Sequence, residues 1–135
     1  MKKNLFFAIP ALIAIVLFSV SCSKSDPTPP TVVTPVGNWV GYQSNGLGGP
    51  LSYFAINFQA NGALVVSANN PTAPDLANGT WSLVADSVRA SFTYAVSGFS
   101  YSLAGKYSTT SSVINGTVGT GVSTSGAGVF SVTRQ

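Results

Sequence analysis

After Val36, apolar and polar residues alternate in one short segment after another, and this alternation constrains the fold more than any other feature of the sequence. In Ser87–Ala95 (SVRASFTYA), apolar and aromatic residues alternate with serine, arginine and threonine. Successive side chains of a strand point to opposite faces, so the pattern predicts a strand with one buried and one solvated face. A slip of one residue would bury Arg89 and expose Phe92, and the register is therefore strongly specified.

Residues that favour turns separate the alternating segments. Ser44–Pro50 is rich in glycine, and Asn61-Gly62 is a strong hairpin signal. Ala68–Asn78 contains two prolines and two adjacent asparagines, which predicts a loop, and Asp86 predicts a tight turn. The strands expected between these breaks are Gly37–Gln43, Leu51–Gln59, Ala63–Ser67, Gly79–Ala85, Ser87–Ala95, Phe99–Tyr107, Ser112–Gly119 and Gly128–Arg134.

The connections between these segments are too short for a helical crossover, so neighbouring strands are expected to pair antiparallel as a meander. Each strand needs a second layer over its apolar face. Closing the sheet on itself supplies that layer and removes both edges. The sequence therefore predicts an all-β fold, a small up-and-down barrel of eight antiparallel strands, with a β-sandwich as the alternative. The side chains expected to face inward are Trp39, Phe54, Ile56, Phe58, Trp81, Leu83, Phe92, Tyr94, Phe99, Tyr101, Leu103 and Phe130.

Charge and chemistry exclude several classes of function. Charged residues make up only 7% of the chain, and three cations with two carboxylates after Pro35 leave a charge of +1 there. Such scattered charge offers no stripe for a phosphate backbone, so nucleic acid is not an expected partner. Histidine and glutamate are absent, and Asp75 and Asp86 are both expected in turns or loops. We therefore expect no enzymatic activity, no cofactor and no metal site.

The first part of the chain has the layout of a secretory signal peptide. Lys2 and Lys3 precede an apolar stretch at Leu5–Val20, which Pro10 interrupts and which is short for a bilayer span. The only cysteine, Cys22, follows at the expected cleavage site. This tail resembles the lipobox of bacterial lipoproteins, which implies cleavage before Cys22 and acylation of that residue. An accidental cysteine after an ordinary signal peptide, or an uncleaved anchor, are the alternatives.

A proline-rich segment follows the cysteine. Ser23–Pro35 (SKSDPTPPTVVTP) is expected to be an extended tether outside the core. The predicted organisation is a signal peptide at 1–21, an acylated cysteine and tether at 22–35, and a barrel domain at 36–135. The lipobox resemblance implies a location in the bacterial cell envelope, at the outer membrane, with its periplasmic and its surface face both open.

The start of the barrel segment carries a second resemblance. Gly37-Asn38-Trp39 is similar to the G-x-W motif of lipocalins and their calycin relatives, although the second lipocalin motif (Thr-Asp-Tyr) is absent. In that family the tryptophan lies near the closed end of the barrel, and an arginine of the last strand packs across it. The resemblance therefore implies a structural pair of Trp39 and Arg134, with a cation–π contact.

The function expected from these features is that of a membrane-anchored binding module. Its ligand would be a small apolar or glycan-like molecule, or a partner protein, and Trp81, Phe92, Tyr94 and Tyr101 are the candidates to line a pocket. The alternative is a structural or accessory lipoprotein with a solid barrel. An internal cavity of roughly 300 Å³ or more would favour a small-molecule ligand over the solid barrel.

Overall fold

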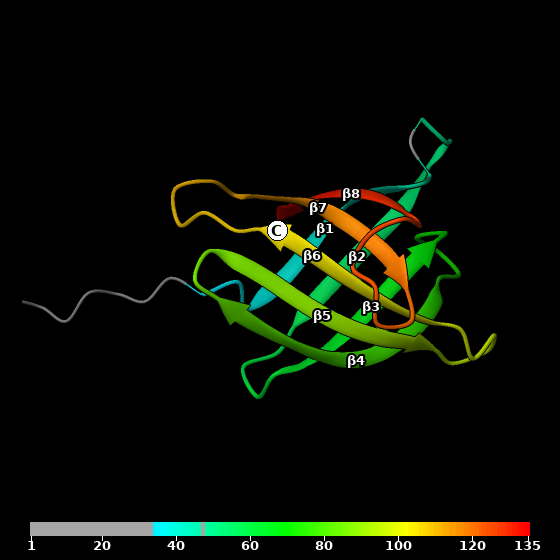
Figure 1. Cartoon of the computed structure of the whole chain (residues 1–135), viewed down its shortest axis with the longest axis horizontal. Coiled ribbons are helices and arrows are strands. Elements are labelled where there is room, and N and C mark those ends of the chain that lie inside the picture. Colours follow the sequence, from blue (N-terminus) through cyan, green and yellow to red (C-terminus); the bar gives the residue numbers. More distant parts are fainter. Residues whose placement is uncertain (1–33, 47) are drawn as a thin grey trace, which may run out of the picture. The chain divides into compact units, whose positions relative to one another are not determined.

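The computed structural model describes residues 34–46 and 48–135. The predicted signal peptide, Cys22 and the tether as far as residue 33 lie outside the described residues. In the described part, no helix is long and apolar enough to cross a membrane. The strands are β1 Gly37–Asn45, β2 Leu51–Phe58, β3 Ala63–Asn69, β4 Asp75–Val84, β5 Ser87–Tyr94, β6 Ser100–Lys106, β7 Val113–Thr120 and β8 Gly128–Arg134 (Figure 1).

The strands pair antiparallel in chain order, and β1 also pairs with β8, so that the sheet closes into a barrel. The closing register places Trp39 opposite Arg134 and Val40 opposite Thr133. The predicted all-β fold with eight antiparallel strands in a closed barrel is therefore confirmed, and the β-sandwich is not. The arrangement is compatible with a lipocalin-like fold.

The loop predicted at Ala68–Asn78 is shorter than expected. Strand β3 continues to Asn69, and β4 begins at Asp75 rather than at Gly79, with Asp75 paired to Ala68. Asn69 adopts a φ of 70° and ends β3, a conformation that asparagine tolerates better than most residues. The expectation that Asp75 lies in a loop is thus wrong, whereas Asp86 does lie in the tight turn between β4 and β5.

The interior of the barrel is apolar, as the alternation predicts. The buried set includes the expected Trp39, Phe54, Ile56, Phe58, Phe92, Leu103 and Phe130, with Trp81, Leu83, Tyr94 and Tyr101 partly buried against them. Phe99 is the exception, because its side chain is 66% exposed. Strand β6 begins only after this residue, and the carbonyl oxygen of Phe99 accepts a hydrogen bond from the Tyr94 amide at 3.0 Å. Phe99 therefore belongs to the β5–β6 loop, and its predicted inward position is wrong.

Glycine at two inward positions makes room for an aromatic ring. A Cβ atom on Gly105 would lie 2.8 Å from Cζ of Phe130, and one on Gly116 would lie 2.6 Å from Cε1 of the same ring. Gly105 and Gly116 are also paired with each other across β6 and β7. The ring of Phe130 on β8 thus fills space that any side chain larger than that of glycine at position 105 or 116 would occupy.

The barrel has two different ends. The loops β1–β2, β3–β4, β5–β6 and β7–β8 lie at one end, here called the mouth end, on the right in Figure 1. The turns β2–β3, β4–β5 and β6–β7, together with Thr34–Val36 and Arg134, lie at the other end, here called the closed end. The chain therefore enters the barrel at the end opposite the mouth.

Candidate functional site

A cavity of about 260 Å³ opens at the mouth end. The inward residues of β5, β6 and β7 that line it are Phe92, Tyr94, Tyr101 and Val118, of which Phe92 and Val118 are buried. Three of the four residues that the sequence predicted for a pocket, Phe92, Tyr94 and Tyr101, therefore lie together at this site.

The three rings pack against one another and form a single wall. Tyr94 meets both of the others edge to face, with centroid distances of 5.8 Å to Phe92 and 5.8 Å to Tyr101. Phe92 and Tyr101 stack at 6.0 Å with an interplanar angle of 24°. Edge-to-face and offset-stacked pairs are the favoured arrangements of aromatic rings, so this wall is held in place before any ligand arrives.

Polar side chains also line the cavity. Gln43 near the end of β1, Asn69 at the end of β3 and Asp75 at the start of β4 all line the cavity. The Asn69 amide nitrogen donates a hydrogen bond to Oδ2 of Asp75, which orients the carboxylate. Among residues 34–46 and 48–135, Asp75 is the only charged residue that lines the cavity.

The phenol of Tyr94 is a donor at neutral pH. Burial raises the pKa of Tyr94 to about 12, repulsion from Tyr101 and Asp75 adds to the rise, and a hydrogen bond with Gln43 opposes it. Loss of the proton would place a second negative charge beside Asp75 in a partly dry site. The cavity therefore presents hydroxyl and amide groups together with one carboxylate.

Trp81 lies away from this cavity. It packs edge to face on Phe58 with a centroid distance of 5.2 Å, and its indole N–H donates to the carbonyl oxygen of Gln59 at 2.9 Å. Both partners adjoin the β2–β3 turn at the closed end. Trp81 shares the inward face with Tyr94, but it lies near the other end of the barrel, so it does not join the predicted pocket.

The closed end is built around Trp39. The guanidinium carbon of Arg134 lies 5.4 Å from the centroid of the Trp39 ring, so the cation–π contact implied by the lipocalin resemblance is present. The indole N–H donates to the carbonyl oxygen of Pro35 at 2.7 Å, and Tyr107 packs edge to face at 6.2 Å. Arg134 also donates from Nη2 to the carbonyl oxygens of Thr34, at 3.0 Å, and of Val36.

This closed end corrects the predicted role of Pro35. The side chain of Pro35 is fully buried, whereas the sequence placed it at the end of a tether outside the core. The physical reason is that Trp39 and Arg134 supply donors for the carbonyl groups of residues 34–36, which satisfy backbone oxygens that would otherwise lose water.

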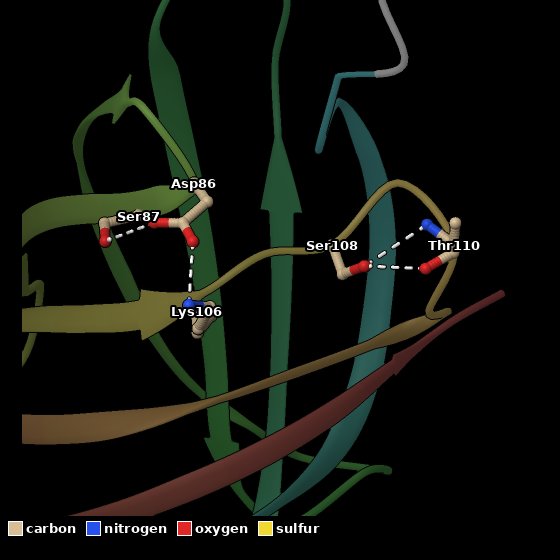
Figure 2. A network of polar contacts seen from close by, with 5 residues as sticks. All are labelled: Asp86, Ser87, Lys106, Ser108 and Thr110. Atoms are coloured by element: carbon tan, nitrogen blue, oxygen red, sulfur yellow. Dashed lines mark hydrogen bonds and ion pairs between the residues drawn. The ribbon is translucent and has the colours of Figure 1, made fainter.

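Exposed side chains at the closed end also form polar contacts with one another (Figure 2). Nζ of Lys106 lies 2.8 Å from Oδ2 of Asp86, and the Ser87 hydroxyl donates to Oδ1 at 3.4 Å. The hydrogen bond and the charge of Lys106 hold the pKa of Asp86 below its usual value, and Asp86 in turn raises the pKa of Lys106. Ser108 and Thr110 bond to each other through their hydroxyl groups at 2.9 Å. Because the Lys106–Asp86 ion pair is solvated, it contributes little to stability.

Within residues 34–46 and 48–135, no group of three histidine, cysteine, aspartate or glutamate side chains is placed to hold a metal ion. Comparison with known protein families, with curated proteins and with solved structures gives no match for this chain. The protein is an antiparallel barrel whose sheet closes on itself. Its interior is filled at the closed end, and a cavity opens at the mouth end.

The sequence missed the polar half of the site. Gln43, Asn69 and Asp75 are not among the predicted lining residues. The sequence predicts Gln43 as the last residue of its strand and places Asn69 and Asp75 in the loop at Ala68–Asn78. One signal was available, since Asp75 and Ala77 continue the inward alternation of Gly79 and Trp81 toward the start of β4. The prolines of the preceding loop obscured it.

Proposed function

We propose that this protein is a non-catalytic binding module, a lipoprotein of the bacterial cell envelope whose barrel takes one small apolar or glycan-like ligand at its mouth end. It would be held on the outer membrane by acyl chains, palmitate among them, on Cys22. The lipobox-like sequence around Cys22 supports the anchor, and the cavity supports the binding function.

The observation that carries the binding function is the cavity itself. Its volume of about 260 Å³ falls slightly below the roughly 300 Å³ at which small-molecule pockets usually begin. An apolar cavity of about 150 Å³ can nevertheless hold a benzene molecule. The site is therefore sized for a single ring with a short substituent, and a long acyl chain would not fit.

The described chain enters the barrel at the end opposite the mouth. Residues 34–36 are fixed at the closed end by Trp39 and Arg134. Four buried or half-buried groups with ligand-contacting chemistry, Gln43, Phe92, Tyr94 and Tyr101, lie at the mouth end.

Binding can be tested by amide chemical-shift mapping with a panel of ring-sized neutral sugars and apolar fragments. We expect shifts at Phe92, Tyr94, Tyr101 and Val118, with Tyr107 at the closed end as the internal control. If no compound in the panel moves the mouth residues, or if the shifts are equal at both ends, binding of a neutral ligand at the mouth is refuted.

Anchoring can be tested separately in cells that are fed a clickable fatty-acid analogue. The wild-type chain should become labelled and fractionate with the outer membrane, and Cys22→Ser should lose both properties. Equal labelling of the two proteins would contradict acylation at Cys22.

A second candidate function is favoured by the rim of the mouth. Leu51, Val96, Phe99 and Val122 are 72%, 94%, 66% and 99% exposed, and all four lie in or beside the mouth-end loops. Solvated apolar side chains on several loops of one end would suit a protein-contact surface where they adjoin one another. The protein would then act as an accessory subunit whose barrel is only a support, and the chemical-shift panel would show no binder.

A further inference from the structure

Charge is divided between the two ends of the barrel. The three cations of the described part, Arg89, Lys106 and Arg134, all lie in the half of the barrel nearer the closed end, as does Asp86. At the mouth end, Asp75 is the only charged side chain among the described residues. The potential at the mouth is therefore set by one carboxylate, and the nearest compensating charges are at the other end.

Asp75 has capacity left for a ligand. In the described part of the chain, its side chain accepts a hydrogen bond from Asn69 and forms no ion pair, since the ion pair found there joins Lys106 to Asp86. An ionised carboxylate has about four acceptor positions, and the remaining ones face the cavity side or water. Asp75 is exposed to solvent at the rim of the cavity, so a ligand donor that reaches its carboxylate replaces part of its hydration.

Resting on the small-molecule function proposed above, we propose that the ligand is a small organic cation, an ammonium group joined to one ring or a short apolar chain. Its nitrogen pairs with Asp75, and its apolar part lies against the wall formed by Phe92, Tyr94 and Tyr101. The Gln43 and Asn69 side chains supply further polar contacts at the rim.

The same arrangement disfavours anionic ligands and neutral ligands relative to cations. An anion would meet Asp75 with no cation among the lining residues to offset the repulsion. A neutral donor can hydrogen-bond to the exposed Asp75 carboxylate, but only a cation adds Coulomb attraction to that bond. An ammonium group near the Tyr94 and Tyr101 rings also gains cation–π attraction. A cationic ligand is thus the one kind of ligand that both the Asp75 carboxylate and the aromatic rings attract.

Three compounds of similar shape test the proposal: phenethylamine, phenethyl alcohol and phenylacetate, which are cationic, neutral and anionic at neutral pH. Their dissociation constants are measured with the full chain in a neutral detergent. We expect the amine to bind about threefold to fivefold more tightly than the alcohol, because an ion pair with an exposed carboxylate adds only a modest Coulomb attraction. Phenylacetate should bind most weakly, and added salt should weaken the amine alone.

Asp75→Asn removes the charge and should bring the amine to the affinity of the alcohol. Asp86→Asn is the matched control, since it removes the other described carboxylate, at the closed end (Figure 2), and should leave all three constants unchanged. Asp75→Ser serves as a second variant if Asp75→Asn proves unstable. Equal binding of the three compounds, or an amine affinity insensitive to both Asp75 variants, overturns the proposal while the binding function stands. Absence of binding by all three, together with a negative neutral panel, overturns both.

Discussion

Replacing Arg134 by methionine tests how the closed end is held together. Methionine keeps an unbranched apolar stem, but it removes the guanidinium group that lies 5.4 Å from the Trp39 ring centroid. The two hydrogen bonds from Nη2 to the carbonyl oxygens of Thr34 and Val36 disappear with it. Arg134→Met should therefore loosen residues 34–36 and lower the free energy of unfolding.

The size of the loss follows from these contacts. The cation–π contact is worth about 0.5–2 kcal/mol, and hydrogen bonds to a charged group about 1.5–3 kcal/mol each when fully buried. Both carbonyl groups bonded by Arg134 are only partly buried, so water can replace much of the second contribution. We expect a total of about 3 kcal/mol. In a folded part of about 100 residues, this lowers Tm by roughly 12–24 °C.

Urea and thermal unfolding followed by circular dichroism provide the measurement, and Arg89→Met is the matched control. Arg89 is exposed on β5, and within the described residues it forms no ion pair or side-chain hydrogen bond. Its replacement should change stability by no more than about 0.5 kcal/mol. Similar losses for the two variants would refute the reasoning. A double-mutant cycle with Trp39→Leu, which removes the aromatic face, measures the coupling between the two side chains, and zero coupling energy would refute the cation–π contribution.

Two further predictions concern the interior and the mouth. Gly116→Ala places a Cβ atom 2.2 Å from the Ala104 carbonyl oxygen and 2.6 Å from the Phe130 ring, so it should cost at least about 1–3 kcal/mol in urea unfolding; a neutral result would contradict the packing described for Phe130. Tyr94 has a pKa of about 12 in the folded state against an ordinary 10.0, so its contribution to stability is complete below pH 10 and disappears as the pH rises through about 12. Tyr94→Phe should abolish that part of the alkaline loss, and an unchanged profile would show that the phenol is not the group responsible.

Most of the fold could be predicted because the alternation of period two fixes which face of each strand is buried. The alternation in Ser87–Ala95 corresponds to β5, whose inward residues are the predicted ones. The closure of the sheet into a barrel is predicted because eight strands each need a cover for an apolar face. The alternation cannot say where a strand begins. Phe99 has the parity of Tyr101 and Leu103, yet it is exposed, because the turn at Gly98 with a φ of 71° delays the first pair of β6.

The candidate site was predictable only in part for a similar reason. Period two gives the face of a residue but not its height along the barrel axis, which depends on how each strand is staggered against its neighbours. Trp81 and Tyr94 share the interior, yet the register pairs Trp81 with Ala90 and places Tyr94 opposite Ala77, at the mouth end. The tight turn at Asp86 does fix this register: counted from the turn, Trp81 lies nearer the closed end than Tyr94, and the facing pattern used to select the pocket residues leaves that height out.

The same stagger explains why the cavity is at the mouth rather than at the centre. An eight-stranded barrel is just wide enough to be filled by its side chains, so empty space requires small residues at one level. Near the closed end, Trp39 and Phe58 fill the interior. At the level of Tyr94, Ala77 on β4 is small and lies directly opposite, and Gly128 lies at the rim, whereas Tyr101 on β6 is large. Deeper in the barrel, the space left by Gly105 and Gly116 is filled by the Phe130 ring. The cavity therefore depends on small residues around only part of the mouth, and not on a general change of residue size along the barrel axis.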